Sequence, residues 1–234
     1  ISTFSPLPAF SGVKIEATMD CLILTGSDSD ISIQTKLKKS EHCVLEIHDM
    51  GSIVIEAKYI LEIVRKIDAD EIEFEMLDGS LTKISGNTAE FRINGMRASE
   101  YPAIDFSKPN ECFNVSEDIL KKIILQTSFA TSDKETRPVL TGVNFQCKEH
   151  QLHCVATDSY RLAKKTVEIE ESLNFNITIP AKSLQEVVKT LEGEGDVEIA
   201  VNDKKAQFII HDTIVQTRLI DGVYPETSRL IPLQ

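Results

Sequence analysis

Leu140-Thr141-Gly142-Val143-Asn144-Phe145 repeats the pattern of Phe10-Ser11-Gly12-Val13-Lys14-Ile15, with an offset of 130 residues from Gly12 to Gly142. The same offset pairs Ser27-Asp28-Ser29 with Thr157-Asp158-Ser159. Self-similarity over two separate motifs is typical of a duplicated structural unit. The sequence therefore predicts two related modules.

Each copy ends in a Tyr-Pro pair, at Tyr101-Pro102 and at Tyr224-Pro225. Proline cannot donate a backbone hydrogen bond, and it holds the preceding residue in an extended conformation, so the pair is typical of a strand end or linker. We place the boundary near Asn110, with a first module over residues 1–110 and a second over residues 111–234.

The two copies differ in what precedes their shared glycine motif. Residues 115–130 come before Gly142, whereas only about nine residues stand at the corresponding place before Gly12. We therefore expect the first module to lack an opening strand and helix. An initial Ile1 in place of Met agrees with a missing N-terminal segment.

Alternating apolar and polar residues at 13–17, 72–76 and 197–201 have the period of two that half-buried antiparallel strands require. Asp78-Gly79 and Asn202-Asp203 supply turn residues, because Gly, Asn and Asp adopt positive φ at low cost. The chain should thus be rich in antiparallel sheet.

Three segments break this period and predict short helices, at residues 57–67, 116–128 and 181–191. Ser116 is placed to cap the second helix, and Glu117 and Asp118 suit its first turn. Its apolar stripe should pack on a sheet. The stripe consists of Ile119, Leu120, Ile123 and Ile124.

The polar faces of these helices carry cations, although the chain has a formal net charge of -12. The cations are Lys58, Arg65, Lys66, Lys121, Lys122, Lys182 and Lys189. One interpretation is ordinary solvated surface, neutralised by Glu62, Asp118 and Glu186. The other is a basic surface, because equivalent helices in successive modules would point their lysines toward the same side.

Several kinds of chemistry find no support in the sequence. It has no phosphate loop of the GxxxxGK[ST] or GxGxxG kind, no GxSxG elbow, no HExxH and no CxxC. We expect surface positions for the histidines at 42, 48, 150, 153 and 211, and reduced, mostly buried thiols for the cysteines at 21, 43, 112, 147 and 154. The sequence predicts no metal, no cofactor and no enzyme.

No apolar run approaches the ~20 residues that span a bilayer, and residues 1–6 do not resemble a signal peptide. We therefore expect a soluble, cytoplasmic protein without a membrane partner.

Tyr160-Arg161-Leu162 directly follows the tight turn predicted at Thr157-Asp158-Ser159. Tyr and Arg are enriched in binding hot spots, so this trio favours a protein interface. The first copy instead has Asp30-Ile31-Ser32 at the matching positions, so the copies differ where function could differ. Simple packing is the alternative.

Four motifs resemble the bacterial DNA sliding clamps, the beta subunits of DNA polymerase III. They are Leu140–Val143, Ala156–Ala163, Ile179–Leu184 and Leu219–Glu226, and Leu24–Asp28 and Glu100–Pro102 extend the match into the first module. The resemblance covers nearly the whole chain. It implies an α+β fold of repeated clamp modules, with antiparallel sheets outside and short helices lining a channel.

The family has three such modules, and two chains close head to tail into a homodimeric ring. This chain would supply the first two modules, with the third absent. The resemblance implies a non-catalytic processivity factor that encircles double-stranded DNA without sequence preference. Implied partners are the DNA polymerase III alpha subunit, the clamp-loader complex and other replication and repair proteins. The alternative is a clamp-fold interaction scaffold that does not encircle DNA.

The resemblance also implies roles for particular residues. The partner-peptide pocket would use Leu140, Thr157, Ser159, Tyr160, Arg161, Leu162, Pro225, Arg229 and Leu230. The residues facing DNA would be Lys58, Lys66, Lys121, Lys122, Lys134, Arg137, Lys182 and Lys189. Phe91 and Ile93 would belong to the ring interface, although their alternation also fits core packing.

Overall fold

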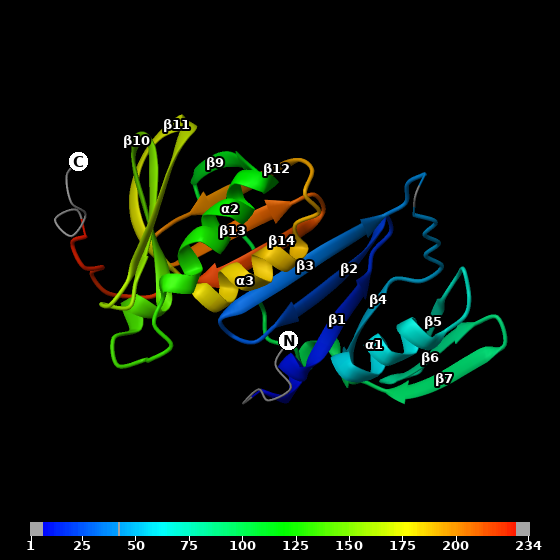
Figure 1. Ribbon diagram of the computed structural model, residues 1–234. Helices are drawn as coiled ribbons and strands as arrows, with labels where there is room; N and C mark the ends of the chain where they lie inside the picture. The colour runs from blue at the N-terminus through cyan, green and yellow to red at the C-terminus, as the bar shows by residue number, and fades with distance from the viewer. Residues whose placement is uncertain (1–6, 42, 228–234) are drawn as a thin grey trace. The chain divides into compact units, whose positions relative to one another are not determined.

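A computed structural model describes residues 7–41 and 43–227. It divides the chain into two compact units (Figure 1). Unit 1 is Ile1–Phe106 with Asp212–Ile214, and unit 2 is Ser107–His211 with Val215–Gln234. The division falls a few residues before Asn110, where the sequence places a module boundary.

Unit 1 is an assembly of antiparallel strands around the helix α1 (Ala57–Lys66). One sheet has the order β8-β4-β1-β2-β3, and a smaller sheet has the order β5-β6-β7. The strands are β1 (Gly12–Ala17), β2 (Cys21–Ser27), β3 (Ile31–Lys38), β4 (Gly51–Glu56), β5 (Glu73–Asp78), β6 (Leu81–Gly86), β7 (Ala89–Asn94) and β8 (Met96–Arg97). Short 3-10 helices occupy Pro8–Ser11 (η1) and Ala98–Glu100 (η2).

Unit 2 combines a long antiparallel pair, β10-β11, with strands in the order β14-β13-β12-β9. Its strands are β9 (Glu111–Ser116), β10 (Gly142–Thr157), β11 (Leu162–Pro180), β12 (Asp196–Val201), β13 (Lys205–Ile210) and β14 (Thr213–Arg218). Its helices are α2 (Glu117–Thr127) and α3 (Ala181–Thr190), with 3-10 turns η3 (Ser128–Ala130) and η4 (Pro138–Thr141). The two α-helices lie next to each other (Figure 1).

The repeat seen in the sequence is also a repeat in strand pairing. In unit 1, Gly12 pairs with Glu56, and α1 begins at the next residue. In unit 2, Gly142 pairs with Pro180, and α3 begins at the next residue. A Cβ added at Gly142 would lie 2.6 Å from the Ile179 carbonyl oxygen, so the close strand approach explains the glycine.

The three predicted helices are present within one or two residues of their expected bounds. The Ser116 hydroxyl accepts a hydrogen bond from the Ile119 N–H and caps α2, as predicted. Leu120, Ile123 and Ile124 are buried against the unit 2 core. Ile119 was wrongly placed in the buried stripe, because it lies on the outer side of the helix and is 39% exposed.

The half-buried strand predicted over residues 72–76 is a strand, β5, but all six of its residues are exposed. β5 is an edge strand that pairs only with β6, and its alternate residues Phe74 and Met76 are 40% and 48% exposed. The alternation marks a face that the described residues leave uncovered. The neighbouring Ile84, in β6, is fully buried.

Two cysteines, Cys147 and Cys154, are buried, and burial raises the pKa of both thiols. The other three are only partly buried, so the expectation of mostly buried thiols is wrong. Among the histidines described, His48, His150 and His211 are exposed and His153 is partly buried, while His42 lies outside the described residues. Across residues 7–41 and 43–227, no helix combines the length and apolar character needed to cross a membrane.

Candidate functional site

The turn from β10 to β11 holds Tyr160 and Arg161 at the surface of unit 2. Ser159 has a φ of 78°, a left-handed conformation that is unusual for serine. The Thr157 hydroxyl stabilises this turn, because it donates to the Arg161 carbonyl at 2.6 Å and accepts from the Ser159 N–H at 3.1 Å. The backbone is thus fixed by side chains of the turn itself.

Asp158 fixes the other half of the turn. Its Oδ1 accepts hydrogen bonds from the N–H groups of Tyr160 and Arg161, at 2.9 and 3.0 Å. These N–H groups, followed by the guanidinium of Arg161, lower the pKa of Asp158 from its ordinary value. The carboxylate therefore remains ionised throughout the neutral range.

Arg161 is held in a defined position. Its Nε donates to Asp158 Oδ2 at 3.0 Å, and its guanidinium carbon lies 5.8 Å from the centre of the Phe129 ring. Tyr160 is 97% exposed. An ordered arginine next to an almost fully exposed tyrosine is an arrangement suited to protein recognition.

A partly buried tyrosine, Tyr224, contacts the turn. The Thr157 N–H donates to the Tyr224 hydroxyl at 3.0 Å, and burial raises the pKa of Tyr224. Leu140, at the end of η4, is also buried, and Leu162 and Pro225 are partly buried. Arg229 and Leu230, also expected in this site, lie outside the described residues.

Arg137, expected to face DNA, contacts the same turn. One of its terminal nitrogens donates to the Ser159 hydroxyl at 3.3 Å. Lys134, in the same loop, is exposed. The structure therefore connects this loop to the turn that carries Tyr160.

Unit 1 contains the same turn in a different setting. Asp28 Oδ1 accepts from the N–H groups of Asp30 and Ile31 at 3.1 and 3.0 Å, and Ser29 has a φ of 83°. Here Tyr101 is buried in edge-to-face contact with Phe10, at a centroid distance of 5.5 Å. Desolvation raises the pKa of Tyr101 to about 12. The hydrogen-bonded turn backbone is therefore present in both units, but the exposed Tyr-Arg pair is present only in unit 2.

The lysines expected to face DNA are all exposed, and they fall into two groups. Four form ion pairs with neighbouring carboxylates: Lys58 with Glu56, Lys66 with Glu62, Lys122 with Asp118, and Lys189 with Glu186. Lys121, Lys134 and Lys182 have no carboxylate partner among residues 7–41 and 43–227. Neighbouring carboxylates therefore neutralise some of these lysines but not all of them.

Phe91 and Ile93 lie on β7, which pairs with β6. Ile93 packs against the core of unit 1, and Phe91 is 36% exposed. The core-packing interpretation thus holds for Ile93, whereas Phe91 remains available to solvent.

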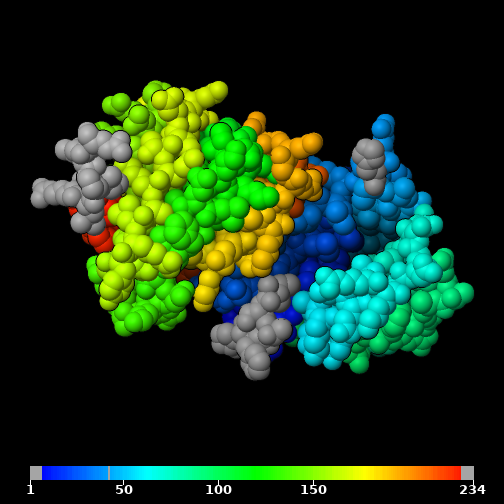
Figure 2. All heavy atoms as spheres, viewed as in Figure 1, coloured from blue at the N-terminus to red at the C-terminus, as the bar shows by residue number. Residues whose placement is uncertain are grey.

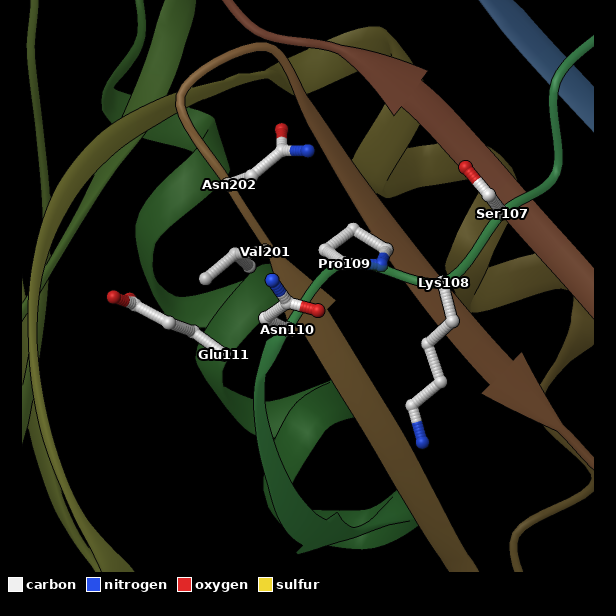
Figure 3. Close-up of a pocket in the computed structure, with 7 residues that line it drawn as sticks. All are labelled: Ser107, Lys108, Pro109, Asn110, Glu111, Val201 and Asn202. Carbon is white, nitrogen blue, oxygen red and sulfur yellow. The ribbon is translucent and has the colours of Figure 1, made fainter.

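A shallow cavity of about 290 Å³ lies elsewhere in unit 2 (Figure 3). It is lined by Ser107, Lys108, Pro109, Asn110, Glu111, Val201 and Asn202. Lys108 is engaged with Glu198 at 2.7 Å. Within the described part of the chain, no three His, Cys, Asp or Glu side chains gather in a way that could hold a metal ion.

Three residues of the turn site were absent from the sequence-based set: Phe129, Asp158 and Tyr224. The Tyr-Pro repeat pointed to Tyr224. The turn residues around Asp158 pointed to that aspartate, because an Asp side chain often accepts a hydrogen bond from the backbone N–H two residues further on. Phe129 had no such signal, because its contact with Arg161 depends on tertiary structure.

Comparison with known proteins places both units in one family. Residues 1–105 match the N-terminal domain of the DNA polymerase III beta subunit, and residues 114–226 match its central domain. The chain belongs to the DNA polymerase III beta subunit family. Its α+β fold of repeated clamp modules follows, and the antiparallel sheets and few helices of the structure agree with it.

Beta subunit relatives include the beta sliding clamps of Bacillus subtilis and Halalkalibacterium halodurans, at 40% and 41% identity over 99% of this chain. The crystal structure of the Bacillus subtilis DNA polymerase sliding clamp superposes with a TM-score of 0.96 at 38% identity. In each case the chain spans 63% of the relative's length.

Proposed function

We propose that this chain contributes two modules to a sliding clamp, which encircles double-stranded DNA and tethers a replicative polymerase to it. The observation that carries the proposal is the ordered turn at residues 157–162, which presents Tyr160 and Arg161 on a member of the beta subunit family. On this proposal the turn binds short apolar peptides of partner proteins. The modules are residues 1–110 and 111–234.

The proposed protein is non-catalytic and cytoplasmic. Its partners are the DNA polymerase III alpha subunit, the clamp loader and other replication and repair proteins, and two full-length chains form the ring. Phe91, exposed on the strand β7, is the candidate contact between chains.

The proposed DNA surface comprises the exposed lysines of α1, α2 and α3. A net charge of -12 does not prevent this, because screening over about 8 Å at physiological salt lets two faces of a protein differ in potential. Lys121 and Lys182 are the strongest candidates, since no carboxylate of the described chain neutralises them.

Replacing both Arg161 and Leu162 by Ala tests the peptide site. We expect this double variant to lose peptide binding and to keep its fold, because Arg161 is exposed and Leu162 is only partly buried. Isothermal titration with a short peptide carrying adjacent leucine and phenylalanine is the measurement. Asp30→Ala, in the matching turn of unit 1, is the control, and unchanged affinity in the double variant would contradict the assignment.

Encirclement is tested with the full-length protein, loaded by an active clamp loader onto a nicked circular plasmid. Release when the plasmid is linearised is the expected result, because a closed ring slides off a free end. Equal retention on circular and linear DNA would indicate ordinary contact. Absence from both, with peptide binding intact, would favour an interaction scaffold that does not encircle DNA.

A further inference from the structure

Phe129 is an exposed aromatic residue on a segment whose backbone is well anchored. It lies in η3, directly after α2, and it is 58% exposed. Thr127 and Ala130, close to it in the sequence, are fully buried, and the Thr127 hydroxyl donates to the Ile123 carbonyl at 2.7 Å. An outward-facing ring at such a fixed position requires a reason other than core packing.

The ring of Phe129 contacts the guanidinium of Arg161. The guanidinium carbon lies over the ring, 5.8 Å from its centre. At that distance the positive charge is attracted to the face of the ring. The ring comes from the end of the α2 segment, which Figure 2 shows at the surface of unit 2, beside α3. The arginine comes from the turn between β10 and β11.

Phe129 and Asp158 constrain Arg161 in different ways. Asp158 Oδ2 accepts a single hydrogen bond, from the Arg161 Nε at 3.0 Å. One such bond leaves the guanidinium plane free to turn about it, and the ring supplies the second contact that fixes the plane. Among residues 7–41 and 43–227, the terminal nitrogens of Arg161 have no hydrogen-bond partner. These donors are therefore available to a ligand.

The charge around Arg161 favours a neutral acceptor over an acidic one. Asp158 is an ionised carboxylate in contact with the guanidinium, so it already balances the positive charge. A second carboxylate at the terminal nitrogens would lie close to Asp158, and like charges at short distance repel each other. A backbone carbonyl oxygen accepts the same N–H groups without that repulsion.

We propose that Phe129 is a positioning residue of the peptide site, which presets Arg161 to bind a backbone carbonyl oxygen of the partner peptide. Phe129 acts through Arg161 and not by contact with the peptide. This inference rests on the peptide-binding function proposed above and adds a specificity to it, because the site takes uncharged peptide groups at Arg161. It leaves the lysines of α2 to DNA.

Phe129→Leu tests the positioning role, because leucine keeps an apolar side chain and removes the ring. We expect the affinity for a short peptide with adjacent leucine and phenylalanine to fall about two- to tenfold, the equivalent of ordering one long side chain on binding. Phe129→Tyr should restore the affinity. Phe74→Leu, the same change at an exposed ring of unit 1, is the matched control. Titration calorimetry gives the affinities.

An NMR readout separates positioning from a structural role. The Nε–Hε signal of Arg161 in the free protein should exchange faster with water in Phe129→Leu, and Phe129→Tyr should reverse the change. An Arg161 signal that does not move would overturn the assignment. So would a free energy of unfolding that falls further in Phe129→Leu than in Phe74→Leu, because the role would then be structural.

A double-mutant cycle separates positioning from direct contact with the peptide. In an Arg161→Lys background, Phe129→Leu should cost nothing further, because lysine has no guanidinium plane to hold. An equal loss of affinity in that background would mean that the ring touches the peptide, and the positioning role would be wrong.

The neutral acceptor is tested with two capped peptides that differ only in the residues flanking the leucine and phenylalanine. One peptide has asparagine there and the other has aspartate. We expect the aspartate peptide to bind no more tightly than the asparagine peptide. Tighter binding of the aspartate peptide that Arg161→Gln removes would reveal an ion pair at Arg161 and overturn the specificity.

Failure of this inference is distinguishable from failure of the proposed function. If the unchanged chain binds the short peptide and Phe129→Leu binds it equally well, only the positioning role is wrong. If the unchanged chain does not bind the short peptide, the peptide-binding proposal is wrong and this inference is wrong as well.

Discussion

Asp158 organises the turn between β10 and β11 through contacts of two kinds. It accepts two backbone N–H groups and pairs with the Arg161 guanidinium. Asparagine could still accept the N–H groups, but it would lose the charge that orients Arg161. The two roles can therefore be separated by substitution.

We expect Asp158→Ala to weaken peptide binding more than Asp158→Asn, because alanine removes both kinds of contact. The measurement is peptide affinity by calorimetry, with the amide signals of Tyr160 and Arg161 followed by NMR. Asp28→Ala, which breaks the equivalent turn in unit 1, is the control and should leave the affinity unchanged. Equal losses for the two Asp158 variants would mean that the N–H contacts contribute nothing.

Tyr101 makes the stability of unit 1 depend on pH in the alkaline range. Its pKa is raised from 10.0 to about 12, so the folded state favours the neutral phenol. That contribution is fully present below pH 10 and is lost as the pH rises through about 12. Urea denaturation across this range should show a falling midpoint, and Tyr101→Phe should flatten the fall. An unchanged slope in that variant would contradict this account.

At the level of elements, Glu117 connects the start of α2 to the loop after α3. Its carboxylate is buried and accepts the N–H groups of Glu192 and Gly193 at 2.7 and 2.6 Å. The other oxygen lies 3.1 Å from His211 Nε2. A buried side chain at the start of α2 therefore connects that helix to the loop after α3 and to His211.

Glu117→Ala should destabilise unit 2 by about 2–4 kcal/mol, because two backbone N–H groups lose their acceptor. Chemical denaturation gives the free energy of unfolding, and hydrogen exchange at Glu192 and Gly193 should accelerate. Asp118→Ala is the control, since Asp118 is exposed and its pair with Lys122 should contribute less than about 0.5 kcal/mol. Similar losses in both variants would contradict the assigned role.

The elements themselves were largely predictable. Ser116, the period of the apolar residues and the turn residues act locally, so the sequence alone located α1, α2 and α3. Burial was less predictable, as β5 and Ile119 show, because it depends on which surfaces other elements cover. The contacts of Arg137 with Ser159 and of Arg161 with Phe129 join segments that are distant in the sequence. A local sequence pattern therefore cannot predict them.

For the whole molecule, an acidic composition coexists with exposed lysines on the helices. Of the lysines assigned to DNA, those with a carboxylate neighbour should contribute least, because their charge is already balanced. DNA association should therefore depend on a few cations rather than on the total count.

Replacing both Lys121 and Lys182 by Glu should weaken association with duplex DNA and reduce its dependence on salt. Each lost phosphate contact lowers the slope of log affinity against log salt by about 0.9. Fluorescence anisotropy at several salt concentrations measures that slope. Lys148→Glu, an exposed position on β10, is the control, and an equal effect there would show that only net charge matters.

The duplicated turn has a consequence for protein engineering. Unit 1 presents the same backbone frame, with an aspartate acceptor and a left-handed serine, but it displays Asp30 and Ile31. Replacing Asp30 by Tyr and Ile31 by Arg would give unit 1 the same pair of side chains that unit 2 has at Tyr160 and Arg161, without a change in the loop. On the proposed peptide-binding function, each chain would then carry two binding sites, and a tandem ligand would gain avidity from the tethering of its two halves.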